Sequence, residues 1–216
     1  MTGQKTIAAI VVAAGRGERA SASGDAEPKQ YRLLAGQPVL ARTIQAFLDV
    51  EGIDWVLPVI HSEHAARFAA LGLADERLLA AVTGGDSRQA SVLAGLTALG
   101  PLRPDLVLIQ DAARPLTEAA VIAGVVAALE SDVAALPVVP VIDTIKRSTD
   151  GRTVAGTEDR HTLFAAQTPQ GFRFAEILEA YVRAAAEPKE FTDDSSLGPR
   201  GRIRWNSGRR GLFPQG

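Results

Sequence analysis

Apolar runs alternate with helix-type patterns along most of the chain. Runs of small and β-branched apolar residues are typical of buried strands, and they occupy residues 7–13, 54–60, 78–82, 106–110 and 133–141. Apolar positions that recur every three or four residues predict helices, over residues 38–49, 62–71, 117–130 and 174–186 and in a segment that places Val92, Leu96 and Leu99 inward. This alternation predicts an α/β fold, with an open, mostly parallel sheet that carries helices on both faces.

Polar residues stand at three of the predicted helix starts. Ser62 and Thr117 each precede a helical pattern, and Asp86 follows a turn at Gly84 and Gly85. Side chains of these types accept hydrogen bonds from backbone N–H groups in the first turn of a helix. We therefore expect Ser62, Asp86 and Thr117 to act as N-caps.

A polar, β-prone stretch at residues 143–154 interrupts the alternation. It contains the pair Asp150-Gly151, which favours a turn between two strands, and residues 163–168 then lead back into the sheet. We expect a β-arm over about residues 142–160 that projects from the sheet. Because unpaired strand edges usually need a partner, we also expect a homodimer through this arm.

The exit of the first predicted strand carries the first candidate chemistry. Gly15 and Gly17 allow the backbone to turn sharply and to approach a ligand closely, and backbone N–H groups exposed at such a turn favour phosphate. Arg19 and, beyond a polar loop, Lys29 add two cations to this region. An isolated pair of this kind would be read as solvated loop charges, but their position after the strand predicts a phosphate site.

Asp111 is the second candidate, at the end of the central apolar run. Ligands bind beyond the carboxyl ends of the strands in open α/β sheets, where a carboxylate can meet Mg²⁺ and triphosphate oxygens. A turn-capping role for Asp111 stays open, and Arg114 either binds a second anion or pairs with Asp111. Structural roles stay open for a further set of polar residues: Asp86, Arg88, Ser91, Thr144, Thr168 and Thr192.

Composition narrows the class of protein. With 216 residues and 46% hydrophobic content, the chain can form one domain with a sizeable core, and it contains no apolar run of membrane-spanning length and no signal-peptide pattern. It has no cysteine, and its three histidines lack metal-ligand spacing. We expect a cytoplasmic protein, and the net charge of −2 argues against a dedicated nucleic-acid binder.

Charge separates the last residues from the rest of the chain. Five arginines and no acidic residue follow position 197, which leaves 18 basic and 25 acidic side chains in the first 197 residues, a net charge of −7. The segment 198–216 shows neither a helical nor a strand pattern. We therefore expect one domain over residues 1–197 and a basic tail that is disordered or results from a shifted reading frame; a phosphate-binding role for its arginines also stays open.

Two other nucleotide-binding classes fit the sequence less well. Residues 15–20 formally match the dinucleotide fingerprint G-x-G-x-x-G/A, but a loop follows them where a helix is required. The second strand also closes about 40 residues later, whereas the acidic residue of that fold lies about 20 residues on. The absence of a Walker A lysine motif disfavours a P-loop enzyme.

Eight short motifs occur in order between residue 6 and Leu197. They are Ala13-Ala14-Gly15-x-Gly17-x-Arg19, Pro28-Lys29-Gln30-Tyr31, Gly84-Gly85-Asp86-x-Arg88-x-x-Ser91-Val92, Asp111-Ala112-Ala113-Arg114-Pro115, Asp143-Thr144-Ile145-Lys146-Arg147, Asp159-Arg160, Gln167-Thr168-Pro169-Gln170 and Thr192-Asp193-Asp194. Each is unspecific alone. Together, and in this order, they resemble the 2-C-methyl-D-erythritol 4-phosphate cytidylyltransferase family.

The resemblance implies a Rossmann-like doubly wound fold with a dimerising β-arm. It also implies transfer of CMP from CTP to 2-C-methyl-D-erythritol 4-phosphate with release of pyrophosphate, in non-mevalonate isoprenoid biosynthesis. It assigns catalytic roles to Arg19, Lys29 and Arg160, and a Mg²⁺ ligand to Asp111. The implied nucleotide-binding residues are Ala13, Ala14, Gly15, Gly17, Gly84, Asp86, Ser91 and Asp111. The implied substrate-binding residues, some of them from the arm of a second subunit, are Arg114, Thr144, Thr168 and Thr192.

The end of the chain departs from this family. Relatives continue after Leu197 through a helix, a strand and a segment with a lysine that positions the substrate phosphate, whereas no lysine follows Lys189 here. Two alternatives therefore stay open: a cytidylyltransferase that acts on ribitol phosphate or another polyol phosphate, and an inactive nucleotide-binding fragment. A fusion of the natural protein to a second enzyme also stays open.

Overall fold

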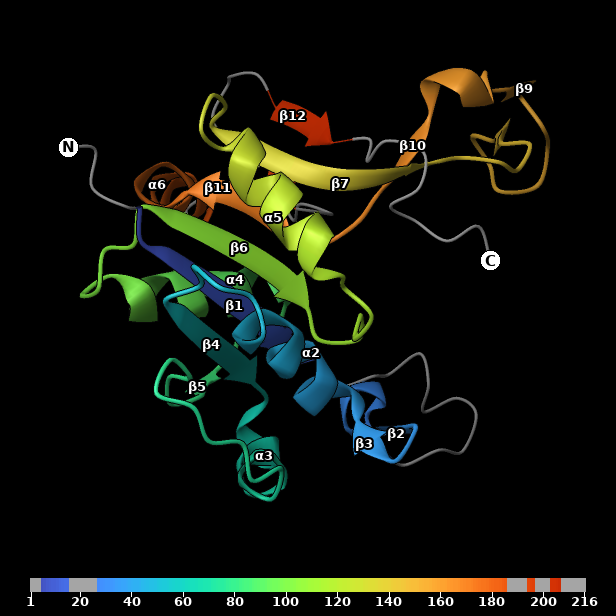
Figure 1. Cartoon of the computed structure of the whole chain (residues 1–216). Helices are drawn as coiled ribbons and strands as arrows, with labels where there is room; N and C mark the ends of the chain where they lie inside the picture. The colour runs from blue at the N-terminus through green and yellow to red at the C-terminus, as the bar shows by residue number, and fades with distance from the viewer. Residues whose placement is uncertain (1–4, 16–26, 186–193, 197–202, 207–216) are drawn as a thin grey trace.

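An eight-stranded sheet runs through the computed structural model, which describes residues 5–15, 27–185, 194–196 and 203–206 (Figure 1). The strand order is β10-β7-β11-β6-β1-β4-β5, with β12 paired to β7. The strands are β1 (Ile7–Ala13), β4 (Trp55–Ile60), β5 (Val82–Thr83), β6 (Leu106–Asp111), β7 (Ala134–Pro140), β10 (Phe164–Ala166), β11 (Gln170–Arg173) and β12 (Ile203–Asn206). Two short hairpins lie outside the sheet, β2 (Leu33–Leu34) with β3 (Gln37–Pro38) and β8 (Lys146–Arg147) with β9 (Gly156–Thr157).

Helices connect these strands. The α-helices are α2 (Val39–Leu48), α3 (Ala65–Ala69), α4 (Arg88–Leu99), α5 (Ala119–Ala128) and α6 (Phe174–Ala185). Short 3₁₀ turns are η1 (Lys29–Tyr31), η2 (Ser62–His64), η3 (Arg160–Thr162) and η4 (Asp194–Ser196). Among the described residues, no helix combines the length and the apolar character that crossing a bilayer would require.

The centre of the sheet is parallel. β1 lies between β4 and β6 and is parallel to both, and β5 continues the parallel order beyond β4. β11 is antiparallel to β6 and β7, and β10 is antiparallel to β7. The predicted α/β architecture is confirmed. Because β1, β4 and β6 run in one direction, their carboxyl ends meet at one edge of the sheet.

Side chains of β1 alternate between two apolar layers. Ala9 and Val11 join the layer that includes α2 and α5, whereas Ala8 and Ile10 join the layer that includes α4 and α6. None of the four exposes any surface. A strand that is buried on both faces requires apolar residues at every position, which explains the continuous apolar run in the sequence.

Two segments of the sheet differ from the prediction. The predicted strand 78–82 is reduced to a bridge between Leu78 and Val56, and β5 begins only at Val82. β11 was not predicted, because its four residues Gln170–Arg173 are short and half polar. Its conformation is set by pairing with β6 and β7 on its two sides, and such tertiary context outweighs local propensity.

The predicted N-cap at Asp86 is wrong. Ser87 caps α4, and its hydroxyl accepts a hydrogen bond from the backbone N–H of Ala90 at 3.0 Å. Both residue types are good caps, so the backbone conformation at Ser87 decides between neighbours. Asp86 is left exposed, two residues before the helix begins.

The caps predicted at Thr117 and Ser62 are also wrong. Glu118 precedes α5 without a side-chain cap, and Thr117 Oγ1 instead lies 3.0 Å from Gln110 Nε2. His61, whose Nδ1 accepts a backbone hydrogen bond, caps η2, and Ser62 lies within that turn. Thr117 therefore makes a loop contact and does not cap a helix, and Ser62 is the first residue of η2 and not its cap.

The arm is a hairpin with a wide loop. β8 and β9 form two residue pairs, so the loop spans residues 148–155 and not a two-residue Asp-Gly turn. Backbone hydrogen bonds from Thr153 and Arg152, together with side-chain hydrogen bonds, hold the pKa of the Asp150 carboxyl well below its usual range. Figure 1 shows the arm projecting from the sheet beyond β7 and β10, as predicted.

The tail contributes a strand to the sheet. β12 is parallel to β7, with Ile203 opposite Ala134 and Asn206 opposite Pro137. The expectation of a wholly disordered tail does not hold for these four residues, because an open sheet edge can pair with a segment that has no strand pattern of its own. The other residues of 198–216 lie outside the described part of the chain.

Gly171→Ala is expected to destabilise the fold by about 1–3 kcal/mol. Gly171 lies in β11 beneath α5, where an added Cβ would meet Val125 Cγ1 at 2.5 Å and Leu129 Cδ1 at 2.9 Å. Both neighbours are buried, so the crowding can be relieved only by a shift of the helix. Urea unfolding followed by circular dichroism measures the change, and an unaltered midpoint would contradict it.

Candidate functional site

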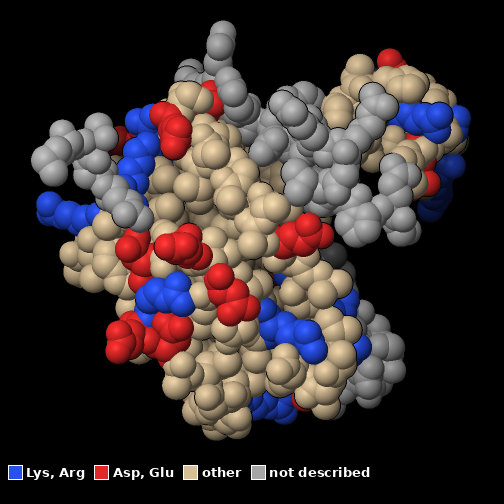
Figure 2. Space-filling view, in the orientation of Figure 1, with Lys and Arg blue, Asp and Glu red and all other residues tan. Residues whose placement is uncertain are grey.

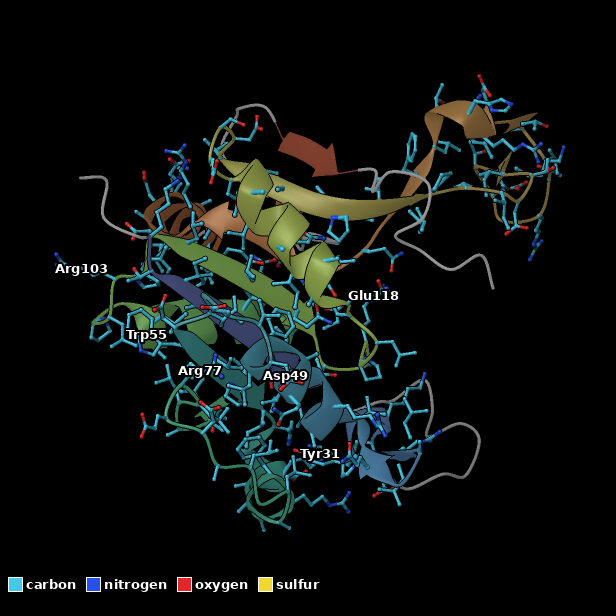
Figure 3. The ribbon with its side chains drawn as sticks, viewed as in Figure 1. Tyr31, Asp49, Trp55, Arg77, Arg103 and Glu118 are labelled. Carbon is cyan, nitrogen blue, oxygen red and sulfur yellow. The ribbon has the colours of Figure 1, made fainter. Side chains whose placement is uncertain are left out.

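A cleft of about 1350 Å³ opens at the carboxyl ends of β1, β4 and β6. Figure 3 shows Tyr31, from η1, at the end of the molecule opposite to Trp55 and Arg103, which lie near the amino ends of β4 and β6. The described residues that line the cleft are Val12, Ala13, Ala14, Gly15, Lys29, Gln30, His61, Ser62, Glu63, Gly84, Gly85, Asp86, Ser87, Arg88, Ser91, Asp111, Ala112, Ala113 and Arg114. The cleft thus brings together the two candidate regions of the sequence.

Gln30 fastens η1 to the exit of β1. The Gln30 side chain is buried, and its Nε2 donates to the carbonyl oxygens of Ala13 and Gly15, each at 3.0 Å. The exposed Lys29, one residue earlier, is thereby held beside the glycine turn. Sequence reasoning assigned no role to Gln30, although it stands inside the motif Pro28-Lys29-Gln30-Tyr31.

Gly84 packs closely against Ala14 on one side of the cleft. A Cβ at Gly84 would lie 2.4 Å from the Cβ of Ala14 and 2.6 Å from Ser91 Oγ. Ser91 Oγ itself lies 2.8 Å from the carbonyl oxygen of Ser87 and 3.2 Å from that of Gly85. The Ser91 hydroxyl therefore orders the loop, and the close approach of two backbone segments requires glycine at position 84.

Asp111 carries one arginine on each of its carboxylate oxygens. Arg88 Nε lies 3.1 Å from Oδ1, and Arg114 Nε lies 3.4 Å from Oδ2. The pairing of Arg114 with Asp111 that the sequence left open is thus observed. Exposed fractions of 33% for the Asp111 side chain and 43% for that of Arg114 leave both accessible from the cleft.

Arg88 is anchored by a buried carboxylate. Its Nη1 and Nη2 donate to the two oxygens of Asp194, each at 2.8 Å, and Asp194 also accepts from the Tyr181 hydroxyl. Burial alone lowers the pKa of Arg88, but its hydrogen bonds to Asp194 and the charges of Asp194 and Asp111 raise it well above the ordinary value. Sequence reasoning left Arg88 unassigned and missed its pairing, because 106 residues separate Arg88 from Asp194.

Thr168 lies on the other side of Asp111. Its Oγ1 is 3.4 Å from the backbone nitrogen of Asp111, and the residue is 8% exposed. Gln167, next to it, accepts a hydrogen bond from Arg114 Nη1. The structure therefore brings Arg114 and Thr168, two of the predicted substrate contacts, together around Asp111.

Thr144 and Arg160 do not reach this cleft within one chain. Both are exposed residues of the arm, and Arg160 Nη1 donates to the carbonyl oxygen of Ile142 at 2.9 Å. The arm extends away from the carboxyl ends of β1 and β4 (Figure 1). Its surface carries Lys and Arg side chains beside Asp and Glu side chains (Figure 2). Gly17, Arg19 and Thr192, the other predicted site residues, lie outside the described residues.

The chemistry of Asp111 fits a magnesium ion that is shared with a phosphate ligand. Mg²⁺ sites in phosphate-binding proteins use one or two carboxylates together with water and phosphate oxygens. Asp111 and the exposed Asp86 both border the cleft. In the described part of the chain, no group of three or more His, Cys, Asp or Glu side chains is arranged to hold a metal ion.

Comparison with known proteins identifies the family. The family model described as 2-C-methyl-D-erythritol 4-phosphate cytidylyltransferase matches residues 7–200. A bifunctional enzyme IspD/IspF from Rhodopseudomonas palustris is 48% identical over 198 residues, which are 91% of this chain and 49% of that protein. A similar protein from Bradyrhizobium diazoefficiens is 47% identical over 200 residues, with the same two shares. The chain spans about half the length of the curated relatives it matches.

Solved structures agree with this match. A 4-diphosphocytidyl-2C-methyl-D-erythritol synthase from Anaerococcus prevotii superposes with a TM-score of 0.83 at 27% identity, over 97% of this chain and 90% of that chain. A 2-C-methyl-D-erythritol 4-phosphate cytidylyltransferase from Thermus thermophilus gives a TM-score of 0.69 at 29% identity, over 94% and 90% of the two chains. The chain belongs to the 2-C-methyl-D-erythritol 4-phosphate cytidylyltransferase family.

Proposed function

We propose that this protein transfers CMP from CTP to 2-C-methyl-D-erythritol 4-phosphate and releases pyrophosphate, a step of isoprenoid biosynthesis. The observation that carries the proposal is one cleft that is lined by Lys29, by Asp111, by residues 13–15 at the end of β1 and by the turn at residues 84–85. The family and the named activities of the relatives support it. Together these features supply a cation, a carboxylate and close backbone approach for a nucleoside triphosphate.

The reaction needs alignment more than proton transfer. A phosphate oxygen of the acceptor attacks the α-phosphorus of CTP, a new phosphorus–oxygen bond forms, and the bond to the β-phosphate breaks as pyrophosphate leaves. Because the attacking oxygen is already anionic, no general base is required. Catalysis then depends on positioning and on neutralising the charge that grows on the phosphates. Lys29, which lines the cleft, is proposed for this task, with Arg19 as its companion.

The nucleoside is proposed to lie between residues 13–15 and the loop that precedes α4. The close contact of Gly84 with Ala14 limits the space for the base, which favours a pyrimidine over a larger purine. Asp86, exposed at the end of that loop, and Gly17 complete the proposed nucleotide contacts. Asp111 would hold a magnesium ion, which when bound would supply positive charge that neutralises part of the triphosphate charge.

The acceptor is proposed to bind on the Arg114 side of the cleft, with Thr168 and Thr192. Thr144 and Arg160 would then come from the arm of a second copy of the chain, because neither residue lines the cleft of its own chain and the arm projects from the sheet beyond β7 and β10 (Figure 1). We therefore propose a homodimer in which each arm completes the site of its partner. The domain limits of 1–197 and a cytoplasmic location remain predictions.

A pyrophosphate-release assay tests the function. We expect release with CTP and Mg²⁺ when 2-C-methyl-D-erythritol 4-phosphate is the acceptor, and none with ribitol 5-phosphate or erythritol 4-phosphate. Release with ribitol 5-phosphate would favour the related cytidylyltransferase. CTP binding without release from any acceptor would favour an inactive nucleotide-binding fragment, which the atypical tail left open.

Gly84→Ala is expected to weaken CTP binding about 5- to 150-fold, which corresponds to ~1–3 kcal/mol for overpacking a close contact. The added methyl group would displace Ala14 or Ser91, which line the cleft. Isothermal titration calorimetry with CTP measures the change. Gly171→Ala is the matched control, because it crowds α5 and not the cleft, and equal affinities in both variants would contradict the assignment.

A further inference from the structure

Asp194 is a fully buried carboxylate beside the cleft, with no assigned role in the proposed reaction. Three elements hold it in place. Arg88 from α4 and Tyr181 from α6 both donate to its oxygens, and the backbone N–H of the next residue, Ser195, donates to Gln170 Oε1 of β11 at 3.0 Å. A carboxylate that is held in this way can fix the position of the side chains that bind to it.

The contact between Arg88 and Asp194 fixes the orientation of the guanidinium. Nη1 and Nη2 meet the two carboxylate oxygens in parallel, at 2.8 Å each. Such a bidentate pair sets both the position and the plane of an arginine. Nε, on the remaining edge of the same plane, is then directed at Asp111 Oδ1, 3.1 Å away.

The two oxygens of Asp111 consequently have different surroundings. Oδ1 faces Arg88, which is itself locked by Asp194. Oδ2 faces Arg114 at the longer distance of 3.4 Å, and Arg114 is the more exposed of the two arginines, at 43% against 35%. Arg114 can therefore leave Oδ2 for an anionic ligand, whereas Arg88 cannot leave Oδ1 without abandoning a buried carboxylate.

We infer that Asp194 is a positioning residue for Asp111. Arg88, held by Asp194 on one side and by Asp111 on the other, turns Asp111 Oδ2 toward the cleft as the oxygen for a metal ion. The inference rests on the proposed function, since it refines the role of Asp111 in that site. It also gives the last residue of the motif Thr192-Asp193-Asp194 a task distinct from substrate contact.

A purely structural role for Asp194 predicts different behaviour in variants. Asp194→Asn leaves Arg88 without its buried counter-charge, so a loss of stability alone would not distinguish the two roles. The double variant Asp194→Asn with Arg88→Gln removes both charges and relieves that penalty. A structural role then predicts recovery of metal affinity together with stability, whereas a positioning role predicts recovery of stability alone.

Titration with Mn²⁺ in the presence of CTP, followed by electron paramagnetic resonance, measures metal affinity without turnover. We expect Asp194→Asn to weaken Mn²⁺ binding about 10- to 100-fold, as the loss of outer partners of a metal ligand does. Tyr181→Phe, which removes one hydrogen bond to Asp194, should weaken it about 2- to 10-fold. The double variant should melt closer to the wild type than Asp194→Asn, yet bind Mn²⁺ as weakly.

Asp75→Asn is the matched control. It removes the carboxylate partner of Arg77, whose side chain is exposed to the same degree as that of Arg88, 36% against 35%, but which does not line the cleft (Figure 3). This control should keep the wild-type Mn²⁺ affinity. Wild-type affinity in Asp194→Asn, or in the double variant, would overturn the inference while the function stands. A wild-type protein that binds no Mn²⁺ with CTP would instead overturn the role of Asp111 itself.

Discussion

Lys29→Ala is expected to lower kcat about 100- to 1000-fold, the usual cost of removing one preorganised donor from a developing negative charge. The Kd for CTP should rise much less, because backbone groups and other cations are also proposed to bind the triphosphate in the ground state. Interactions that strengthen as the reaction proceeds affect turnover more than binding. Steady-state pyrophosphate release and calorimetric CTP titration measure the two quantities separately.

Two further variants test whether the effect depends on the charge and the position of Lys29. Lys29→Arg keeps the positive charge and should retain part of the activity, although a guanidinium cannot place its charge in the same position. Lys5→Ala removes an exposed lysine beside the first strand, outside the cleft, and should leave kcat unchanged. Equal losses in kcat and in CTP affinity for Lys29→Ala would mean that Lys29 only holds substrate.

Asp111→Asn is expected to lower kcat/KM by a factor on the order of 1000, since metal stabilisation of phosphate charge contributes several kcal/mol. The amide cannot offer an anionic oxygen to Mg²⁺, and it leaves Arg88 and Arg114 without the charge that separates them. The stability cost should be small, about 1 kcal/mol or less, because the Asp111 side chain is one-third exposed.

Activity as a function of Mg²⁺ concentration, together with a thermal melt, measures both effects. Asp105→Asn provides the control, since Asp105 directly precedes the amino end of β6 and bonds to Thr6 away from the cleft. It should keep its activity. If Asp111→Asn reached wild-type kcat at high Mg²⁺, or unfolded before activity could be measured while Asp105→Asn did not, the proposed role of Asp111 would be wrong.

The central sheet could be predicted because its strands are buried on both faces. The continuous apolar runs that became β1 and β6 leave few alternatives in a chain of this length. β11 and β12 had no comparable signal, since their conformation comes from pairing with β7. Helix starts were predicted less well, because Asp86 and Ser87 are adjacent residues with similar capping ability and only the backbone conformation selects Ser87.

Parts of the candidate site could also be predicted from the sequence, and other parts could not. The meeting of Gly15 and Asp111 follows from the shared direction of parallel strands, which the sequence indicates. Lys29 joins them because the Gln30 side chain ties η1 to the end of β1, a contact that sequence reasoning did not assign. The pairing of Arg88 with Asp194 depends on how α4, α6 and a distant turn pack together, and no local pattern encodes it. Arm residues such as Arg160 belong to a third class, because one chain alone does not bring them to the cleft.

The Gln30 amide has a consequence for how a nucleotide would be received. Its amide nitrogen donates to the carbonyl oxygens of Ala13 and Gly15 at the end of the first strand, which ties η1 and its Lys29 to these two residues. Their relative position is therefore set before any ligand arrives. A ligand that binds in this cleft would not have to order these segments first, which favours a preformed binding site over an induced fit on this side of the cleft.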